Sequence, residues 1–425
     1  MSNVHSLYIA GTVGPHNNGK FYLSKLEGDT FSKSYDFPKI PGGVVNQQIM
    51  CQAIYNGELY VAGGGGAYPY LAKLNNKTNQ LSNNLLEGNF DNIPPETDYI
   101  NAMTIYKEKL YLGCDVGAIS YYDGKTFFPS SKFKYNKKLS YLNCMNVHND
   151  ELYIGGTWAD AQDDSILNLY VAKLESDGVT FNDNFTFTGE VNDTHMLGIN
   201  SMITYNGELY IGGHSAVGEG FKPLYFSKLG NNNTFESNII DNTNPVFVTK
   251  DQDSNIDSLV AYKERIYLGF WSSAAETGKG PHNQVYYDIK NKTFTKVLFD
   301  NSIKEVDIMD MAIYENDLYG VSGGEDISGS EEDYVFKLDS DGTKFNSFGK
   351  NVPSDGGIQS IIDYHPDVKH ASDGSGGGKK IYKKNSISHD NLKLILGLSV
   401  GLGLPILGVI IFLMYKYGLR NKLSN

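Results

Sequence analysis

Polar side chains recur at one position of a repeated pattern, and they are the strongest candidates for binding chemistry in this chain. Five amides or acids each stand one residue before a small residue in successive repeats: Asn101, Asn143, Asn200, Asp257 and Gln359. In the other two repeats Met50 and Met309 hold this position. Such side chains, lining a central channel, can hold a polar ligand or a cation. They can equally satisfy one another and channel water, because buried polar groups need partners.

Aromatic and histidine side chains form a second candidate set. They fall in the segments 156–168, 213–223 and 270–284, each of which joins the second to the third strand of its repeat: Trp158, His214, Phe221, Trp271 and His282. With segment 323–333, these are the longest predicted loops. Exposed aromatic side chains on loops above a rigid scaffold commonly bind proteins. We therefore expect a loop face that binds a protein or a glycan.

Catalytic and metal-binding motifs are missing from the sequence. The nine histidines are scattered, and no pair has zinc-site spacing. No GxSxG nucleophile motif occurs. Cys51, Cys114 and Cys144 are odd in number, have no metal-ligand spacing, and are expected to be small buried residues. We predict no catalytic residues, no metal and no cofactor.

A repeated strand pair must position all these residues. The first strand of each repeat begins with an aliphatic residue and ends six residues later in tyrosine, except at His148: Ile49–Tyr55, Ile100–Tyr106, Leu142–His148, Ile199–Tyr205, Ile256–Tyr262, Ile308–Tyr314 and Ile358–Tyr364. A tyrosine of the second strand follows five residues later: Tyr60, Tyr111, Tyr153, Tyr210, Tyr267 and Tyr319. The spacing runs from 42 residues, between Ile100 and Leu142, to 57, between Leu142 and Ile199. Such periods are typical of β-propellers.

The two chain ends complete one repeat between them. The last copy, Ile358–Tyr364, has no second strand after it, whereas the N-terminal SLYIAG, with Tyr8, is a second strand without a first. Six whole repeats and two complementary halves make seven. The sequence thus predicts an all-β, seven-bladed propeller, closed by pairing of its N- and C-terminal strands.

Each repeat carries four strand signals. Short polar turns such as Asn56-Gly57 join the first two strands and are strong hairpin signals. The second strand ends in glycines, which permit close backbone approach at a bulge or turn. The fourth strand begins at an aromatic or aliphatic residue: Phe31, Leu81, Phe127, Phe181, Phe235, Phe294 and Phe345.

This pattern resembles the kelch and galactose-oxidase type of β-propeller over residues 5–367. The shared features are the tyrosine before the hairpin, the aliphatic-tyrosine strand, the Gly-Gly pair and the outer aromatic, which here is phenylalanine instead of the usual tryptophan. The resemblance implies a fold more than a function, and the copper site of galactose oxidase does not map onto this sequence. A looser likeness is to fungal membrane-anchored cell-cortex proteins that carry kelch-like repeats.

Charge separates the repeat region from the C-terminal end. The formal net charge is −13, and residues 379–425 carry a net +7, which leaves −20 for the rest. An acidic domain repels nucleic acid and anionic lipid headgroups. We therefore predict no nucleic-acid partner.

The C-terminal segment has the pattern of a membrane anchor. Residues 368–391 are rich in Gly, Ser and Lys and predict a flexible linker. The uncharged stretch from Leu394 to Tyr415, within a predicted transmembrane helix at 392–416, is long enough to cross a bilayer. A short basic tail, 417–425, follows. We predict domain boundaries at 1–367, 368–391, 392–416 and 417–425.

Two placements of the propeller relative to the membrane fit the sequence. Read literally, the sequence has no signal peptide, and the single-pass protein is tail-anchored with a cytosolic propeller. The alternative is a cell-surface protein with an extracellular propeller, whose signal peptide is missing from this chain. Five N-x-[ST] sequences, at Asn76, Asn184, Asn192, Asn232 and Asn291, are compatible with that alternative.

The favoured function is a non-catalytic, membrane-anchored platform that recognises a protein or a glycan through its loop face. Two alternatives remain: a propeller enzyme, for instance of the galactose-oxidase type, and a structural unit that clusters through its membrane helix.

Overall fold

The computed structural model describes residues 5–372 except 15–18, 39–46, 66–67, 76, 90, 92, 94–96, 133–139, 160–166, 179, 189–197, 215–223, 242–245, 248–253, 273–283, 300–307, 323–333, 350–351, 353–355 and 366–369. The chain divides into two compact units, Met1–Lys380 and Ile381–Asn425, and all described residues belong to the first.

The described part of the chain is all-β, apart from short 3-10 segments such as η2 (Asn231–Asn233). The first two sheets have the strand orders β29 (Gly356–Tyr364), β1 (Ser6–Val13), β2 (Lys20–Glu27), β3 (Thr30–Phe31), and β30 (His370–Ser372), β4 (Gln48–Tyr55), β5 (Glu58–Gly65), β6 (Tyr68–Asn75), β7 (Gln80–Leu81). The next two are β8 (Ile100–Tyr106), β9 (Lys109–Cys114), β10 (Ala118–Tyr122), β11 (Phe127–Lys132), and β12 (Ser140–His148), β13 (Glu151–Ala159), β14 (Leu167–Leu174), β15 (Phe181–Asn182).

The remaining strands form three sheets. A three-stranded sheet contains β17 (Gly198–Tyr205), β18 (Glu208–His214) and β19 (Leu224–Lys228), beside a parallel pair of β16 (Thr186–Phe187) and β20 (Thr234–Phe235). An eight-stranded sheet has the order β21 (Ser254–Tyr262), β22 (Arg265–Ser272), β23 (Gln284–Asp288), β24 (Thr293–Phe299), β28 (Lys344–Ser347), β27 (Tyr334–Leu338), β26 (Asp317–Ser322), β25 (Asp310–Tyr314). Its two halves are antiparallel and meet in the parallel pair β24–β28.

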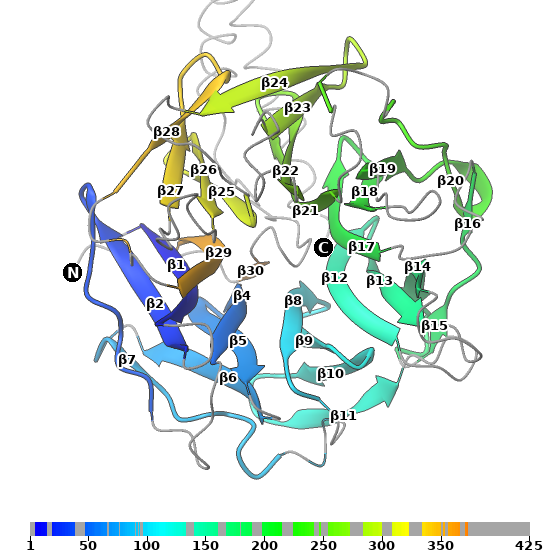
Figure 1. Ribbon diagram of the computed structural model, residues 1–425. Helices are drawn as coiled ribbons and strands as arrows, with labels where there is room; N and C mark the ends of the chain where they lie inside the picture. Colours follow the sequence, from blue (N-terminus) through cyan, green and yellow to red (C-terminus); the bar gives the residue numbers. More distant parts are fainter. Residues whose placement is uncertain are drawn as a thin grey trace, which may run out of the picture. The chain divides into compact units, whose positions relative to one another are not determined.

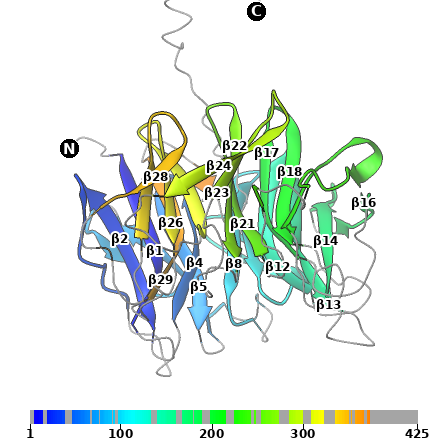
Figure 2. The ribbon, with the colours of Figure 1, turned by 45° about the horizontal axis from the view of Figure 1, so that its top comes forward.

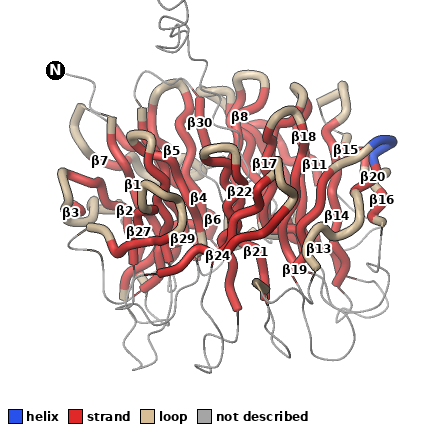
Figure 3. The backbone as a smooth tube through the Cα atoms, turned by 90° about the horizontal axis from the view of Figure 1, so that it is seen from above, coloured by secondary structure: helices blue, strands red, loops and turns tan. Residues whose placement is uncertain are grey.

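The small sheets of this unit are arranged around a common centre, which we call the ring (Figure 1). Within each predicted repeat the first strand lies nearest the centre, and later strands follow outward, as β4, β5 and β6 do. Seen from the side, the strands of successive sheets run up and down next to one another (Figure 3). The predicted residues of the fourth strands lie in the outer strands β3, β7, β11, β15, β20, β24 and β28.

The two ends of the repeat region pair in one sheet, as predicted. β1 and β29 are antiparallel neighbours, with Leu7 opposite Asp363 and Gly11 opposite Ile358. Figure 2 shows the two strands side by side. A sheet made from both chain ends joins the last repeat to the first.

Two-residue turns connect the first and second strands. Asn56 and Gly57 have positive φ angles of 53° and 77°, and Tyr55 pairs with Glu58 across them. Lys107 and Glu108 adopt the same left-handed conformation without glycine, at 46° and 61°. Positive φ at both central residues is typical of the type I′ turn, whose twist suits β-hairpins.

The hydrophobic core lies between neighbouring sheets. One buried cluster combines Leu7 and Ile9 of β1 with Val321 of β26 and Val335 of β27. Another combines Ile54 of β4 with Leu23 of β2. Because each sheet is buried by its neighbours, no single repeat would bury its own apolar faces.

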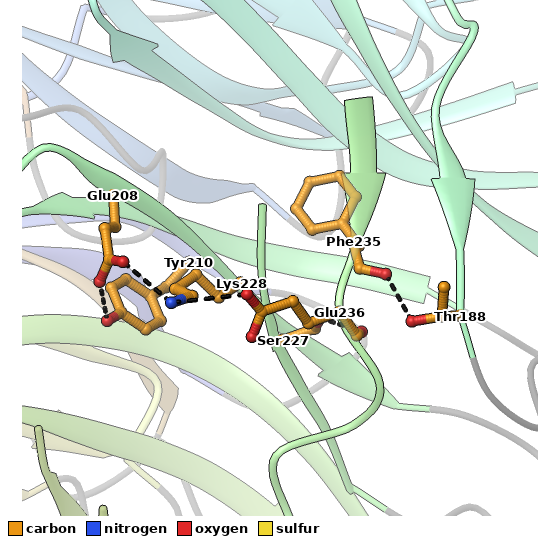
Figure 4. Close-up of polar contacts among 7 residues, drawn as sticks. All are labelled: Thr188, Glu208, Tyr210, Ser227, Lys228, Phe235 and Glu236. Atoms are coloured by element: carbon orange, nitrogen blue, oxygen red, sulfur yellow. Dashed lines mark hydrogen bonds and ion pairs between the residues drawn. The ribbon is translucent and has the colours of Figure 1, made fainter. Parts of the chain in front are cut away.

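In six repeats the second-strand tyrosine is flanked by one of two charge arrangements. In the first, an acid before the tyrosine pairs with a third-strand lysine, as Glu208 does with Lys228 at 2.9 Å (Figure 4). Tyr210 donates a hydrogen bond to the same carboxylate at 2.7 Å, and Lys228 also contacts Glu236 at 3.5 Å. The same acid–lysine pairing recurs in Glu58–Lys73, Glu151–Lys173 and Asp317–Lys337.

Two repeats invert this arrangement. In them a cation precedes the second-strand tyrosine, and a tyrosine replaces the third-strand lysine. Lys109 Nζ lies 4.0 Å from the ring centre of Tyr121, and Arg265 Cζ lies 4.1 Å from that of Tyr286. A cation–π contact therefore stands where those four repeats have an ion pair.

The C-terminal segment departs from the predicted linker at one point. Residues 370–372, placed in the linker 368–391, form strand β30 on the inner edge of β4. Within the described residues, no helix is long and apolar enough to cross a bilayer. The predicted span 392–416, the tail 417–425 and the rest of the linker lie outside the described residues.

Candidate functional site

The predicted polar position is the extra residue of a β-bulge. Six innermost strands shift register at the same place relative to their second strands, for example between Ile199 and Ser201 and between Ile256 and Ser258. The residues in the bulges are Met50, Asn101, Asn143, Asn200, Asp257 and Gln359. Bulges re-aim side chains and are frequent beside functional sites. We call this end of the innermost strands the bulge end.

The glycine pair of the second strand accommodates the bulge. A Cβ on Gly213 would overlap the carbonyl oxygen of Gly198, on the first strand of the same sheet. A Cβ on Gly212 would lie 2.7 Å from Cγ2 of Ile256, in the next sheet. One glycine therefore admits the bulged backbone, and the other admits the neighbouring sheet.

Three bulge residues form a chain of hydrogen bonds across three sheets. Asn143 Nδ2 donates to Asn200 Oδ1 at 3.0 Å, and Asn200 Nδ2 donates to Asp257 Oδ1 at 3.2 Å. All three side chains are half-buried. Both amides thus donate in the same direction around the ring, and this series of hydrogen bonds ends on the Asp257 carboxylate.

Two further residues extend this chain. Asn255 Nδ2 donates to Asp257 Oδ1 at 2.6 Å, and Asn255 Oδ1 faces His214 Nδ1 at 3.0 Å. With an amide oxygen opposite it, His214 Nδ1 carries a proton and donates. We call Asn143, Asn200, Asp257, Asn255 and His214 the polar chain.

Burial controls the charge of Asp257. Loss of solvation raises the pKa of this carboxyl to about 7, and the hydrogen bond from Asn200 opposes the rise. Protein atoms surround Asp257 although it keeps partial contact with solvent. Contact with water limits this rise in the pKa of Asp257. The site changes charge near neutral pH.

The other two predicted bulge residues lie outside the polar chain. Asn101 Nδ2 donates to the carbonyl oxygen of Leu142 in the next sheet at 3.2 Å. Gln359 lies beside Gly357, where a Cβ would be 3.2 Å from its Nε2 atom. The structure thus joins Asn143, Asn200 and Asp257 by hydrogen bonds, whereas these contacts of Asn101 and Gln359 involve other partners.

An exposed aromatic side chain lies on β12, the strand that also carries Asn143. Tyr141, two residues before Asn143, is 44% exposed and pairs with Thr157 across the sheet. In the next sheet a Cβ on Gly198 would lie 2.8 Å from Thr157 Oγ1 and 3.0 Å from His214 Cε1. The absent side chain at Gly198 leaves room between these groups.

Sequence reasoning missed Tyr141, Thr157 and Asn255. The one signal in the sequence is their position, since each falls one or two residues from a predicted site residue. Their partners become visible only when the bulges fix the pairing.

The structure places the predicted loop residues in different kinds of position. Trp158 is not on a loop: it lies in β13, half-buried against the cluster that contains Leu142 and Tyr170. This correction arises because β13 extends to Ala159 and pairs with β14. Trp271 also lies in a strand, β22, opposite Asn255. His214 ends β18 and joins the polar chain, whereas Phe221 and His282 lie outside the described residues.

The cysteines occupy buried positions between sheets. Cys51, Cys114 and Cys144 are all free thiols. The thiol of Cys144 faces the carbonyl oxygen of Ile199 in the next sheet at 3.8 Å. Within the described ranges, no three His, Cys, Asp or Glu side chains come close enough to hold a metal ion.

Two solved structures illustrate what the chain is similar to, and both likenesses are distant. No protein-family model and no curated protein matches the chain. It is similar to PorZ, a bacterial surface component of the type-IX secretion system of Porphyromonas gingivalis, with 12% identity over 77% of this chain and 45% of that chain and a TM-score of 0.44. This chain therefore spans less than half the length of PorZ. It is also similar to an α-L-arabinofuranosidase from Lactobacillus brevis, with 12% identity, 58% and 91% coverage of the two chains, and a TM-score of 0.37. Scores this low carry no functional inference.

Proposed function

We propose that the chain is a seven-bladed β-propeller of the kelch-like type that acts as a non-catalytic recognition platform. The seven sequence repeats support the number of blades. The pairing of β1 with β29 supports circular closure. The eight-stranded sheet counts as two blades whose outer strands β24 and β28 touch in parallel.

The binding site of this platform is the bulge end of the ring. One observation carries this proposal: the hydrogen-bond chain that runs through Asn143, Asn200 and Asp257 on three separate strands. A polar ligand that exchanges hydrogen bonds with this chain would be oriented by all three sheets at once. The exposed ring of Tyr141 adds an apolar surface on the same strand as Asn143.

The chemistry of the site favours a ligand rich in hydroxyl or amide groups, such as a glycan or a polar protein segment. Amides offer both donors and acceptors, and aromatic rings pack against flat apolar faces. The acidic character of residues 1–378 disfavours nucleic acid.

The platform is held at a membrane by the apolar segment Leu394–Tyr415. This part of the proposal rests on the sequence, since that segment carries no charge. The cytosolic and the extracellular placement of the propeller both remain compatible with it. Endoglycosidase treatment of the expressed protein separates them, because a mobility shift places the propeller outside the cytosol.

A paired binding screen tests the function. Full-length protein in detergent is applied to a glycan array and to immobilised membrane-protein extract, beside the variant Asn200→Ala/Asp257→Asn. We expect signals that the wild type gives and the variant loses. Identical signals from both proteins would refute a site at the polar chain. Copper or another metal in the purified protein, together with oxidase or hydrolase activity, would favour an enzyme instead.

A further inference from the structure

Strand β30 occupies a place that the repeat does not provide. It pairs antiparallel with β4 through His370–Tyr55, Ala371–Ile54 and Ser372–Ala53. β4 is the first strand of its repeat, so β30 lies on the inner edge of that sheet. Among the sheets of the described residues, this one alone carries a strand inside the first strand of the repeat.

The direction of β30 shows that the chain turns back after closing the ring. β29 ends at Tyr364, and β30 begins six residues later. Because β30 is antiparallel to β4, it runs from Tyr55, beside the hairpin turn, toward Ala53 and the bulge end. β30 therefore lies toward the centre of the ring and not at its rim.

The inner edge of β4 is suited to accept a strand. Ala53, Ile54 and Tyr55 are buried, so the edge offers backbone groups in apolar surroundings. Unpaired backbone groups at a sheet edge are a template for strand addition, and burial increases the benefit of pairing them. Three residues form few hydrogen bonds, whose sum is similar to the cost of ordering them. The pairing is therefore reversible.

β30 and the polar chain lie on different sides of the centre. β30 contacts β8 as well as β4. Figure 1 draws it beside these two strands, across the centre from β17 and β21, which carry Asn200 and Asp257. One side of the ring's centre is thus covered by the chain's own backbone.

We propose that the inner edge of β4 is a strand-docking surface whose partner is the chain's own segment His370–Ser372. Docked in cis, this segment screens the β4 side of the centre. This docking does not depend on whether the polar chain binds a ligand.

Hydrogen–deuterium exchange on the full-length protein in detergent tests the docking. We expect backbone amides of residues 52–55 in β4 to exchange roughly threefold to tenfold more slowly than those of residues 145–148 in β12, the equivalent inner strand. Equal exchange in the two strands would overturn the proposal. Protection of β4 that grows with protein concentration would also overturn it, because a second copy would then supply the strand.

A proline substitution tests whether residues 370–372 are the cause. Ala371→Pro removes a backbone donor from β30 and disfavours strand pairing, and Gly376→Pro, later in the same segment, is the matched control. Exchange of residues 52–55 should rise in Ala371→Pro alone, with β5 unchanged. An unchanged β4 in Ala371→Pro would overturn the proposal. The comparison within the wild type stands even if this variant fails to fold.

Discussion

The hydroxyl of Tyr364 donates a hydrogen bond of 2.9 Å to the carbonyl oxygen of Gly57, 307 residues away in the chain. Tyr364 ends the innermost strand of the closing sheet, and Gly57 lies in the hairpin turn of the next sheet. Two other tyrosines at this position make the same bond to the next turn: Tyr55 to Glu108 at 2.9 Å and Tyr262 to Asn316 at 2.8 Å. The repeated tyrosine therefore ties each of these sheets to its successor.

Removing the Tyr364 hydroxyl should weaken the contact between the closing sheet and the sheet that follows it. We expect Tyr364→Phe to lower the free energy of unfolding by about 1 kcal/mol, the usual net value of one hydrogen bond. Tyr55→Phe should cost a similar amount. Urea unfolding followed by tyrosine fluorescence measures both. Tyr68→Phe, at a side chain that is 42% exposed, is the control and should have no effect. Equal stability of all four proteins would contradict a role for this bond.

Exchanging both residues of one charge arrangement for both residues of the other should largely preserve the free energy of unfolding. Lys109→Glu removes the cation from the Tyr121 ring and should cost roughly 0.5–1 kcal/mol. Adding Tyr121→Lys recreates the arrangement of Glu151 and Lys173 and should recover most of this loss. A double-mutant cycle by chemical denaturation gives the coupling energy. A coupling energy of zero would mean that the two positions vary independently.

Gly213 should tolerate no side chain. In Gly213→Ala the new Cβ would overlap the carbonyl oxygen of Gly198, so the bulge must shift. We expect a loss of about 2–3 kcal/mol in unfolding free energy. Gly357→Ala is the control, since the nearest atom to its Cβ is the flexible Gln359 Nε2 at 3.2 Å. If the two variants are equally stable, the close approach is not a constraint.

Asp257 should make stability depend on pH in an unusual direction. Its pKa is raised from 3.8 to about 7 by burial, so between these values the folded state binds more protons than the unfolded state. The contribution to stability is thus fully present below about pH 4 and is lost as the pH rises through 7. Wild type should lose thermal stability from pH 5 to 8 relative to Asp257→Asn.

The comparison with Asp257→Asn cancels other acids, including Asp115, whose pKa burial raises to about 6. Asp288→Asn is the control, because backbone N–H donors such as that of Asn291 lower the pKa of Asp288. Its difference from wild type should stay constant over this pH range. A constant difference for Asp257→Asn as well would show that the carboxyl is already ionised at pH 5.

Much of the fold could be predicted because the repeat constrains it. Seven copies of one pattern identify the tyrosines, the turns and the pairing of Leu7–Gly11 with Ile358–Tyr364, since a half-repeat at each end has one complement. The exception at His148 also fits the pattern: its Nδ1 atom lies 3.3 Å from Thr204 Oγ1, in the neighbouring sheet.

The candidate site was predicted only in part. Alignment of the repeats identified Asn143, Asn200 and Asp257, but pairing partners such as Asn255 depend on a register shift that the alignment does not contain. The prediction for Trp158 was wrong because strand lengths vary between sheets. β13 continues to Ala159, into the segment that was expected to be a loop. β30 was missed because its three residues, His370, Ala371 and Ser372, carry no apolar periodicity; an existing edge accepts them through the backbone.

The most direct test of the recognition site is the affinity of three proteins for the strongest ligand from the binding screen. Wild type, Asn200→Ala and Asn83→Ala, the last at an exposed asparagine, are titrated under identical conditions after their thermal stabilities are matched. The polar-chain account predicts at least roughly tenfold weaker binding for Asn200→Ala and wild-type affinity for Asn83→Ala. Equal affinity of all three proteins would contradict it.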